Sequence, residues 1–344
     1  MQKTLIAFSI MATAAGAVNA TTIYHKDGTK INLDGRLSLE IANFSNKRTD
    51  LIDRGSRLRL HAYQDIGSGF SALANVEFRF SNDNIGDNLH TKRLYAGIRH
   101  KQGTLTFGKQ ALLGDSIGYS NFTYELGKIA KLTTAADKSV SFLSGEFNGF
   151  RFGADYLFGS AAKHADNDRD KEKLSDKGNG FTLALFYRQK FEQLTVEAAG
   201  GYGEKKDGKL ASNEYTQKLA GTSVRFAYGP AAIGFDWAHA KSPAGHADHR
   251  FRIGRAKFEK LNQFELGMKY HLTEQHKVYA EYLWGTGETK GKADGDFSGW
   301  FLGADHKFNQ YVVIYVEGGT FKTKQAGNTL EKEKRIALGS RVYF

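Results

Sequence analysis

Residues suited to nucleophilic or metal chemistry are few in this chain, and no pattern brings them together. Cysteine is absent, and the 11 histidines include His246 and His249 in a His-Ala-Asp-His segment. That spacing is poor for a metal site, and no third ligand is evident. Other histidines lie far apart on strand-like segments, at His61, His239, His271 and His306. We therefore expect no catalytic residue, no metal ion and no cofactor.

Charged side chains instead recur at alternate positions, where they could line a water-filled passage. Arg57 and Arg59 flank Leu58, for example. Successive side chains of a strand point to opposite faces, so one face is charged and the other is apolar. A charged side chain facing lipid at mid-depth would cost about 2–4 kcal/mol, which fixes the register. The residues that we expect to line a pore in this way are Arg59, Tyr63, Glu77, Arg79 and Tyr95.

The same two-residue period recurs along the chain in short segments, which predicts an all-β, antiparallel fold. We expect about 16 strands, at 32–41, 57–63, 70–80, 93–99, 105–109, 138–147, 150–158, 181–190, 194–202, 217–228, 231–240, 261–271, 277–285, 298–307, 311–321 and 335–344. Short turns alternate with long polar connections, an arrangement typical of outer-membrane β-barrels. A barrel of this size has a lumen too wide for side chains to fill, so an aqueous channel is expected.

The last strand offers a way to close the sheet. Leu338, Val342 and Phe344 share one face of it, and the first strand, 32–41, alternates in the same manner. We expect these two strands to pair, because unpaired edges cannot exist in hydrocarbon. Phe344 would then end the terminal strand on which assembly depends.

Residues 1–20 have the features of a secretory signal peptide. A basic start precedes an apolar run at 5–18, and Val18-Asn19-Ala20 is a plausible cleavage site. The remainder, 21–344, is expected to be one barrel domain, since it holds no apolar run long enough for a transmembrane helix. The formal net charge is +11. Export and the even spread of charge argue against nucleic acid as a partner and favour anionic lipid or an anion path.

Three stretches of sequence carry a family likeness. They are TIYHKDGTKINLDGR at 22–36, FLGADHKF at 301–308 with YVEG at 315–318, and the closing RVYF at 341–344. They resemble Gram-negative general porins, in particular the major outer-membrane porins of Haemophilus and its relatives. The resemblance implies a homotrimer of barrels in the outer membrane, each narrowed by a third loop folded inward. The partners it implies are outer-membrane lipid and lipopolysaccharide, the outer-membrane assembly machinery, and small hydrophilic solutes and ions.

The stretch 110–137 is the longest without a period, and we expect it to be that third loop. Long unpatterned loops are usually functional or disordered. It is less charged than 160–180 and rich in residues suited to packing against an inner wall: Leu112, Leu113, Ile117, Tyr119, Phe122, Tyr124, Leu126 and Ile129.

The resemblance also implies that loop carboxylates face a ladder of basic residues on the early strands. Matched position by position, the loop acids are Asp115 and Glu125, the latter in Tyr-Glu-Leu-Gly where the family has Pro-Glu-Phe-Gly. The ladder residues are Arg36, Arg57, Arg93 and Lys109. Lys109 replaces the commoner arginine, and alternation with Phe107 would point it outward unless a bulge follows Gly108.

The leading interpretation is a passive diffusion channel for ions and small hydrophilic solutes across the bacterial outer membrane, with electrostatic sieving at the narrowed aperture. The sequence leaves open whether the channel prefers cations weakly or anions. One alternative is a barrel enzyme, a lipase or protease, which would need a catalytic cluster at one rim. Another is a substrate-specific channel or an adhesin. A sugar channel would show a slide of lumen aromatics, and Tyr63, Tyr95 and Tyr279 are few and scattered.

Overall fold

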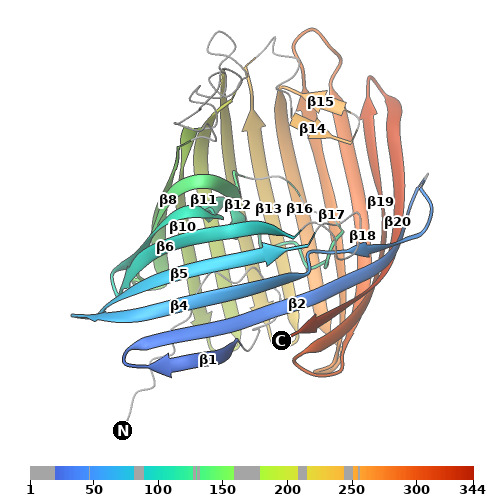
Figure 1. Ribbon diagram of the computed structural model, residues 1–344. Helices are drawn as coiled ribbons and strands as arrows, with labels where there is room; N and C mark the ends of the chain where they lie inside the picture. Colours follow the sequence, from blue (N-terminus) through green and yellow to red (C-terminus); the bar gives the residue numbers. More distant parts are fainter. Residues whose placement is uncertain are drawn as a thin grey trace.

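The computed structural model describes residues 20–45, 47–80, 89–126, 129, 132–158, 179–207, 215–243, 251–254 and 256–344. The expected signal peptide lies outside these ranges except for Ala20, so it stays a prediction. The described chain forms a barrel of tilted strands (Figure 1), with β1 at the lower rim and β14 and β15 near the upper rim.

Eighteen strands form one sheet, in which β1 (Thr21–Lys26) and β3 (Asp50–Asp53) are short side pairings on β2 (Thr29–Phe44). The other 16 make an antiparallel ring, which confirms the expected fold class and strand number. They are β2, β4 (Arg57–Gly67), β5 (Phe70–Arg79), β6 (His90–His100), β7 (Gly103–Ala111), β8 (Ala135–Ser144), β9 (Phe150–Phe158), β10 (Asn179–Phe191), β11 (Leu194–Asp207), β12 (Tyr215–Tyr228), β13 (Ala231–Lys241), β16 (Lys260–His271), β17 (His276–Glu288), β18 (Gly295–Lys307), β19 (Val312–Gln325) and β20 (Asn328–Tyr343).

The ring closes between β2 and β20, as expected. The two strands pair from Arg36 opposite Tyr343 to Phe44 opposite Arg335. Beyond this ladder, Gly35 and Phe344 exchange two backbone hydrogen bonds, of 2.8 and 3.2 Å. Closure removes the unpaired sheet edges that would otherwise attract other chains.

Alternation separates an apolar outer face from a polar lumen, which confirms the predicted register. Leu94 and Phe107 are 59% and 53% exposed on the outer face, whereas Asp34 and Glu77 are 3% and 0% exposed on the inner face. The buried side chains therefore lie inside the barrel. The third loop also lies inside the barrel, and its described part includes the 3-10 turn η1 (Leu113–Ser116). In the described ranges no helix is both long enough and apolar enough to cross a membrane.

Two of the long connections expected between the predicted strands, at 241–260 and 322–334, need correction. The stretch 322–334 is no long loop, because β19 and β20 continue through it to a two-residue turn. Ala326 and Gly327 form this turn with φ of 52° and 78°, the left-handed conformation that a tight hairpin requires. The connection between β13 and β16 holds a small hairpin of its own, β14 (Phe251–Ile253) and β15 (Ala256–Phe258).

Gly35→Ala should weaken barrel closure. A Cβ on Gly35 would lie 2.4 Å from the Phe344 ring and 2.7 Å from the Arg57 carbonyl oxygen. Overpacking of this kind costs about 1–3 kcal/mol. The measurement is the temperature at which the compact, folded band disappears in gel electrophoresis. Gly200→Ala is the control, because its Cβ would meet nothing nearer than 3.6 Å; equal transition temperatures for both variants would contradict the prediction.

Candidate functional site

The third loop, which joins β7 to β8, folds into the lumen and packs against the inner wall as expected. Leu112, Ile117 and Leu126 are each no more than 3% exposed. Leu113 and Ile117 pack with side chains of the wall in one apolar cluster. The loop is therefore a fixed part of the barrel interior and sets the width of the passage.

Backbone N–H groups of this irregular loop are satisfied by carboxylates on the wall strands. Asp155 of β9 accepts the Leu113 amide at 2.8 Å. Asp236 of β13 accepts the amides of Tyr119 and Ser120 at 3.0 and 3.3 Å, and the Ser120 hydroxyl at 2.5 Å. A buried N–H left without an acceptor would cost about 1–3 kcal/mol.

Two more strands continue the same arrangement toward the end of the loop. Glu281 of β17 accepts the amides of Phe122 and Thr123. Glu317 of β19 accepts the Glu125 amide at 3.2 Å. We call the full set the wall acids: Asp155, Asp236, Glu265 (which accepts the Ile129 amide at 3.2 Å), Glu281 and Glu317.

Glycines give the loop backbone room to touch the wall. Gly234 and Gly267 lie opposite each other on β13 and β16. A Cβ on Gly267 would come within 1.7 Å of the Ser120 carbonyl oxygen, and one on Gly234 within 2.3 Å of the Tyr119 carbonyl oxygen. Any larger residue at these positions would push the loop into the passage.

Aromatic rings of the loop lie over cations of the wall. The pairs, with distances from the cation to the ring centroid, are Tyr119 and Arg225 at 5.3 Å, Phe122 and Lys269 at 5.4 Å, and Tyr124 and Lys277 at 4.8 Å. Tyr124 also stacks on Tyr315 and donates its hydroxyl to Asp305 at 2.6 Å. Burial, and then this hydrogen bond, raise the pKa of the Tyr124 phenol well above its ordinary value, so the phenol remains a donor.

Five arginines gather on the lumen face of the early strands, and we call them the arginine wall: Arg36, Arg57, Arg59, Arg79 and Arg93. Glu77 lies among them with an exposed fraction of 0%. Its carboxylate is 2.5 Å from Arg79, 3.6 Å from Arg93 and 4.0 Å from Arg57. Glu77, expected to line the pore, is therefore buried among the arginines and holds them in place.

A cavity separates the arginine wall from the third loop. Arg57, Arg59 and Arg93 line it on one side, and Leu112 and Asp115 line it on the other. The Asp115 carboxylate is 3.9 Å from the Arg93 guanidinium. The structure thus brings together four of the residues that sequence reasoning placed at or near a constriction.

Glu125 and Arg36 have other partners. Glu125 forms an ion pair of 2.5 Å with Arg341 of β20, so it ties the loop to the strand that closes the barrel. Arg36 donates to the carbonyl oxygens of Gly55 and Arg54 at 3.3 and 3.2 Å. Arg36 therefore stands at one end of the arginine wall, where it orders the connection after β3.

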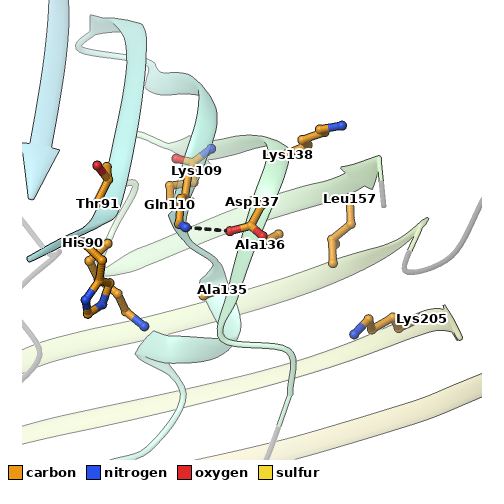
Figure 2. Close-up of a pocket in the computed structure, with 11 residues that line it drawn as sticks. His90, Thr91, Lys109, Gln110, Ala135, Ala136, Asp137, Lys138, Leu157 and Lys205 are labelled. Atoms are coloured by element: carbon orange, nitrogen blue, oxygen red, sulfur yellow. Dashed lines mark ion pairs between the residues drawn. The ribbon is translucent and has the colours of Figure 1, made fainter. Parts of the chain in front are cut away.

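Lys109 is not brought to the arginine wall. The register of β7 and β8 does shift after Gly108, but the extra residue lies on β8, where Asp137 and Lys138 oppose Lys109 alone, so alternation along β7 continues. Gln110 is the residue turned inward, whereas Lys109 stays opposite Leu94, which belongs to the outer face. Its ammonium group pairs with Asp137 at 3.0 Å in a pocket that His90 and Lys138 also line (Figure 2).

The remaining predicted residues lie on lumen faces without forming a cluster. Tyr63 of β4 lies under the Arg99 guanidinium, 5.4 Å from its ring centroid, and Tyr95 of β6 is half-buried opposite Asn75. Among the residues that the structure describes, no group of three or more acidic or histidine side chains could hold a metal ion.

Comparison with known proteins identifies the family. The family model for Gram-negative porins matches residues 7–326. The chain belongs to the Gram-negative porin family. A major outer membrane protein of Pasteurella multocida is 34% identical, with 100% of both chains covered. This porin is thus a passive diffusion channel of the outer membrane, and its rim of short turns faces the periplasm.

Solved structures share the fold at low sequence identity. A loop-deletion mutant of the Vibrio cholerae outer membrane protein OmpT has a TM-score of 0.70 at 19% identity, over 92% of this chain and 100% of that one. An anion-selective porin from Comamonas acidovorans has a TM-score of 0.67 at 17% identity, over 92% and 100%. Salmonella typhi OmpF in complex with daunomycin has 0.66 at 13%, over 93% and 99%.

Sequence reasoning missed the wall acids and Arg341 as partners of the loop. A signal was available for the acids, because Asp236, Glu265, Glu281 and Glu317 fall on the inward faces of β13, β16, β17 and β19. A run of inward carboxylates in a lumen that also holds an irregular loop predicts acceptors for its amides.

Gly267→Ala should push the third loop further into the passage and lower the single-channel conductance of this porin. The new Cβ would overlap the Ser120 carbonyl oxygen, and relieving such an overlap costs about 1–3 kcal/mol. Conductance in planar bilayers is the measurement. Gly318→Ala is the matched control on β19, because its Cβ would meet only the Arg335 carbonyl oxygen at 3.5 Å. Unchanged conductance in a folded Gly267→Ala barrel would show that the loop is not seated as described.

Proposed function

We propose that the passage between the third loop and the arginine wall sieves solutes by charge and size and favours anions. The observation that carries the proposal is the cavity in which Arg57, Arg59 and Arg93 face Asp115. At this place the loop contributes one carboxylate, and the opposing wall contributes three guanidinium groups. Small polar solutes with a dipole can align in the transverse field, while lipophilic solutes must order the water around them.

The strength of such a field follows from the distances. Two unit charges 4 Å apart interact by about 4 kcal/mol at an effective dielectric constant of about 20. The Arg93–Asp115 separation of 3.9 Å is of this order. A narrow passage with low-dielectric walls concentrates the field further. A solute that crosses therefore meets an oriented field over a short distance.

The charge balance points toward anions. The wall acids Asp236, Glu265, Glu281 and Glu317 are at most 2% exposed, because the loop covers them. Solutes in the passage therefore meet guanidinium groups in excess of carboxylates. The description of the Comamonas relative as anion-selective agrees with this direction.

We further propose that this porin has no catalytic activity and no dedicated sugar slide. Of the tyrosines that could form a slide, Tyr63 and Tyr95 are half-buried and isolated. Tyr279 is covered, as is Tyr315, with exposed fractions of 4% and 1%. Their hydroxyl groups are already donated to Glu317 and Glu40. A saturable block of current by a sugar would favour the substrate-specific alternative.

Replacing Arg57 and Arg93 together with alanine should reduce the preference for anions. Removal of both charges takes away two of the three wall guanidinium groups that face Asp115 in this cavity, and the ratio of anion to cation permeability should fall on the order of tenfold, or ~1.4 kcal/mol. Reversal potentials in a KCl gradient measure this ratio. Lys101→Ala, which removes a charge from an exposed turn, is the control. The sieving proposal fails if the double variant keeps the wild-type ratio.

We propose a homotrimer as the working assembly, in contact with outer-membrane lipid and lipopolysaccharide and inserted by the outer-membrane assembly machinery. One relative, OmpT of Vibrio cholerae, is described in a trimer form. Here the outer face of β4, β5 and β6 carries a row of small residues in register, Ala62, Ala74 and Ala96, in an apolar depression. Small residues allow close approach of another barrel, so we assign the subunit contact to this face.

Ala74→Trp should convert trimers into monomers, because the indole would fill the depression into which a neighbouring barrel packs. Ala280→Trp is the matched control, since Ala280 also lies between outer-face residues of two adjacent strands, Met268 and Leu302. Mass by light scattering in detergent distinguishes the two states. A trimer that survives Ala74→Trp would place the contact on another face.

A further inference from the structure

A second group of cations lies toward the periplasmic rim and is separate from the arginine wall. Lys269 and His271 belong to β16, Lys277 to β17 and Lys307 to β18. His271 lies directly opposite Lys277. Lys277 lies opposite Asp305, two residues before Lys307 on the same strand. Because paired residues on one face have Cβ atoms about 4.5–5.5 Å apart, these four cationic or titratable side chains form one patch, which we call the lysine patch.

The lysine patch faces the lumen. Met268 and Tyr270, on either side of Lys269, are 49% and 48% exposed on the outer face, so Lys269 points inward. Lys269 and Lys277 also contact rings of the third loop, which lies inside the barrel. The strands that carry the patch end at the short turns 272–275 and 308–311. The patch therefore lines the vestibule between the loop and the periplasm.

The positive charge of the patch is only partly neutralised. Lys277 pairs with Asp305 at 2.9 Å, and the same carboxylate accepts the Tyr124 hydroxyl. Within the part of the chain that the structure describes, no carboxylate lies within 4.0 Å of the ammonium group of Lys269 or Lys307. The ammonium groups of Lys269 and Lys307 and the imidazole of His271 can therefore bind a ligand.

We propose that the lysine patch is a binding site for phosphate-bearing anions, either inorganic phosphate or phosphate monoesters, at the periplasmic mouth of the channel. An ammonium group is a compact point charge that binds phosphate oxygens well. Several ammonium groups on one face favour a compact multivalent anion over chloride, because all of them can contact the oxygens of the same phosphate group. The proposal goes beyond sieving at the aperture and does not depend on the arginine wall.

Because the lysine patch lies at the periplasmic mouth, the effect of phosphate on the current should depend on the side of the membrane to which it is added. Phosphate that occupies the vestibule from the periplasmic side reduces the positive potential there and obstructs the exit, so it lowers the chloride current. Phosphate on the outer side must first pass the aperture between Asp115 and Arg93. The same concentration should therefore act more strongly from the periplasmic side.

The test is the chloride current of single channels in a planar bilayer, with potassium phosphate added to one chamber at a time over a constant KCl background. The chain has no cysteine, so a Lys292→Cys substitution in the exposed connection after β17 provides a unique label that identifies the outer side of each inserted channel. The variant pair is Lys269→Gln with Lys307→Gln. Lys101→Gln, which removes a lysine from a turn on the same rim, is the matched control.

We expect phosphate added on the periplasmic side to reduce the current of the wild type in a saturable manner. The phosphate concentration that gives half of this reduction should rise on the order of tenfold for each ammonium group removed. Lys101→Gln should behave as the wild type. A Lys269→Arg, Lys307→Arg variant should retain the effect, which separates loss of charge from misfolding.

Three results would overturn the site: an equal effect from both sides, an equal effect in wild type and in the double glutamine variant, or an equal loss in Lys101→Gln. The Arg57→Ala, Arg93→Ala variant distinguishes failure of the lysine patch from failure of the sieving proposal. If its ion selectivity is unchanged while the side-dependent phosphate effect persists, sieving fails and the lysine patch stands.

Discussion

The interior of this barrel depends on one requirement, which is that the backbone N–H groups of a buried, irregular loop must find acceptors. A helix satisfies its own interior amides and a strand bonds to its neighbours, whereas a loop packed against a wall has no such partners of its own. The wall acids meet the requirement from five different strands, and Asp236 alone accepts two amides and one hydroxyl. The position of the loop is therefore set by carboxylates whose own places are fixed by the strand register.

That arrangement also decides which charges a solute meets. The carboxylates that bind the loop are covered by it, and the loop's own Glu125 is paired with Arg341. The arginine wall is different, because Glu77 is shared among three guanidinium groups and cannot neutralise them all. Loop anchoring and the proposed anion preference thus have a common physical cause, which is the use of acids on one side of the lumen as loop acceptors.

Much of this architecture could be predicted from the sequence, because alternation is a local property. The charges at Arg57 and Arg59 fix the face of β4 without knowledge of any other strand. The apolar residues of 110–137 likewise identified the loop that packs inside. Pairing of the first strand with the strand that bears Phe344 could be predicted because unpaired sheet edges are too costly in hydrocarbon.

The partners inside the lumen could not be predicted in the same way. Contacts such as the Glu317 carboxylate with the Glu125 amide join residues 192 positions apart, and pairing of this kind depends on the path of the loop in three dimensions. Lys109 shows the same limit on a smaller scale. A bulge at Gly108 would have been needed to turn Lys109 inward, but the extra residue lies on β8. Gln110 therefore keeps to the inner face by alternation and bonds Thr106 and Ser139, while Lys109 pairs with Asp137. Which of two paired strands carries the extra residue of a bulge depends on the partner strand, and the sequence around Gly108 alone does not contain that information.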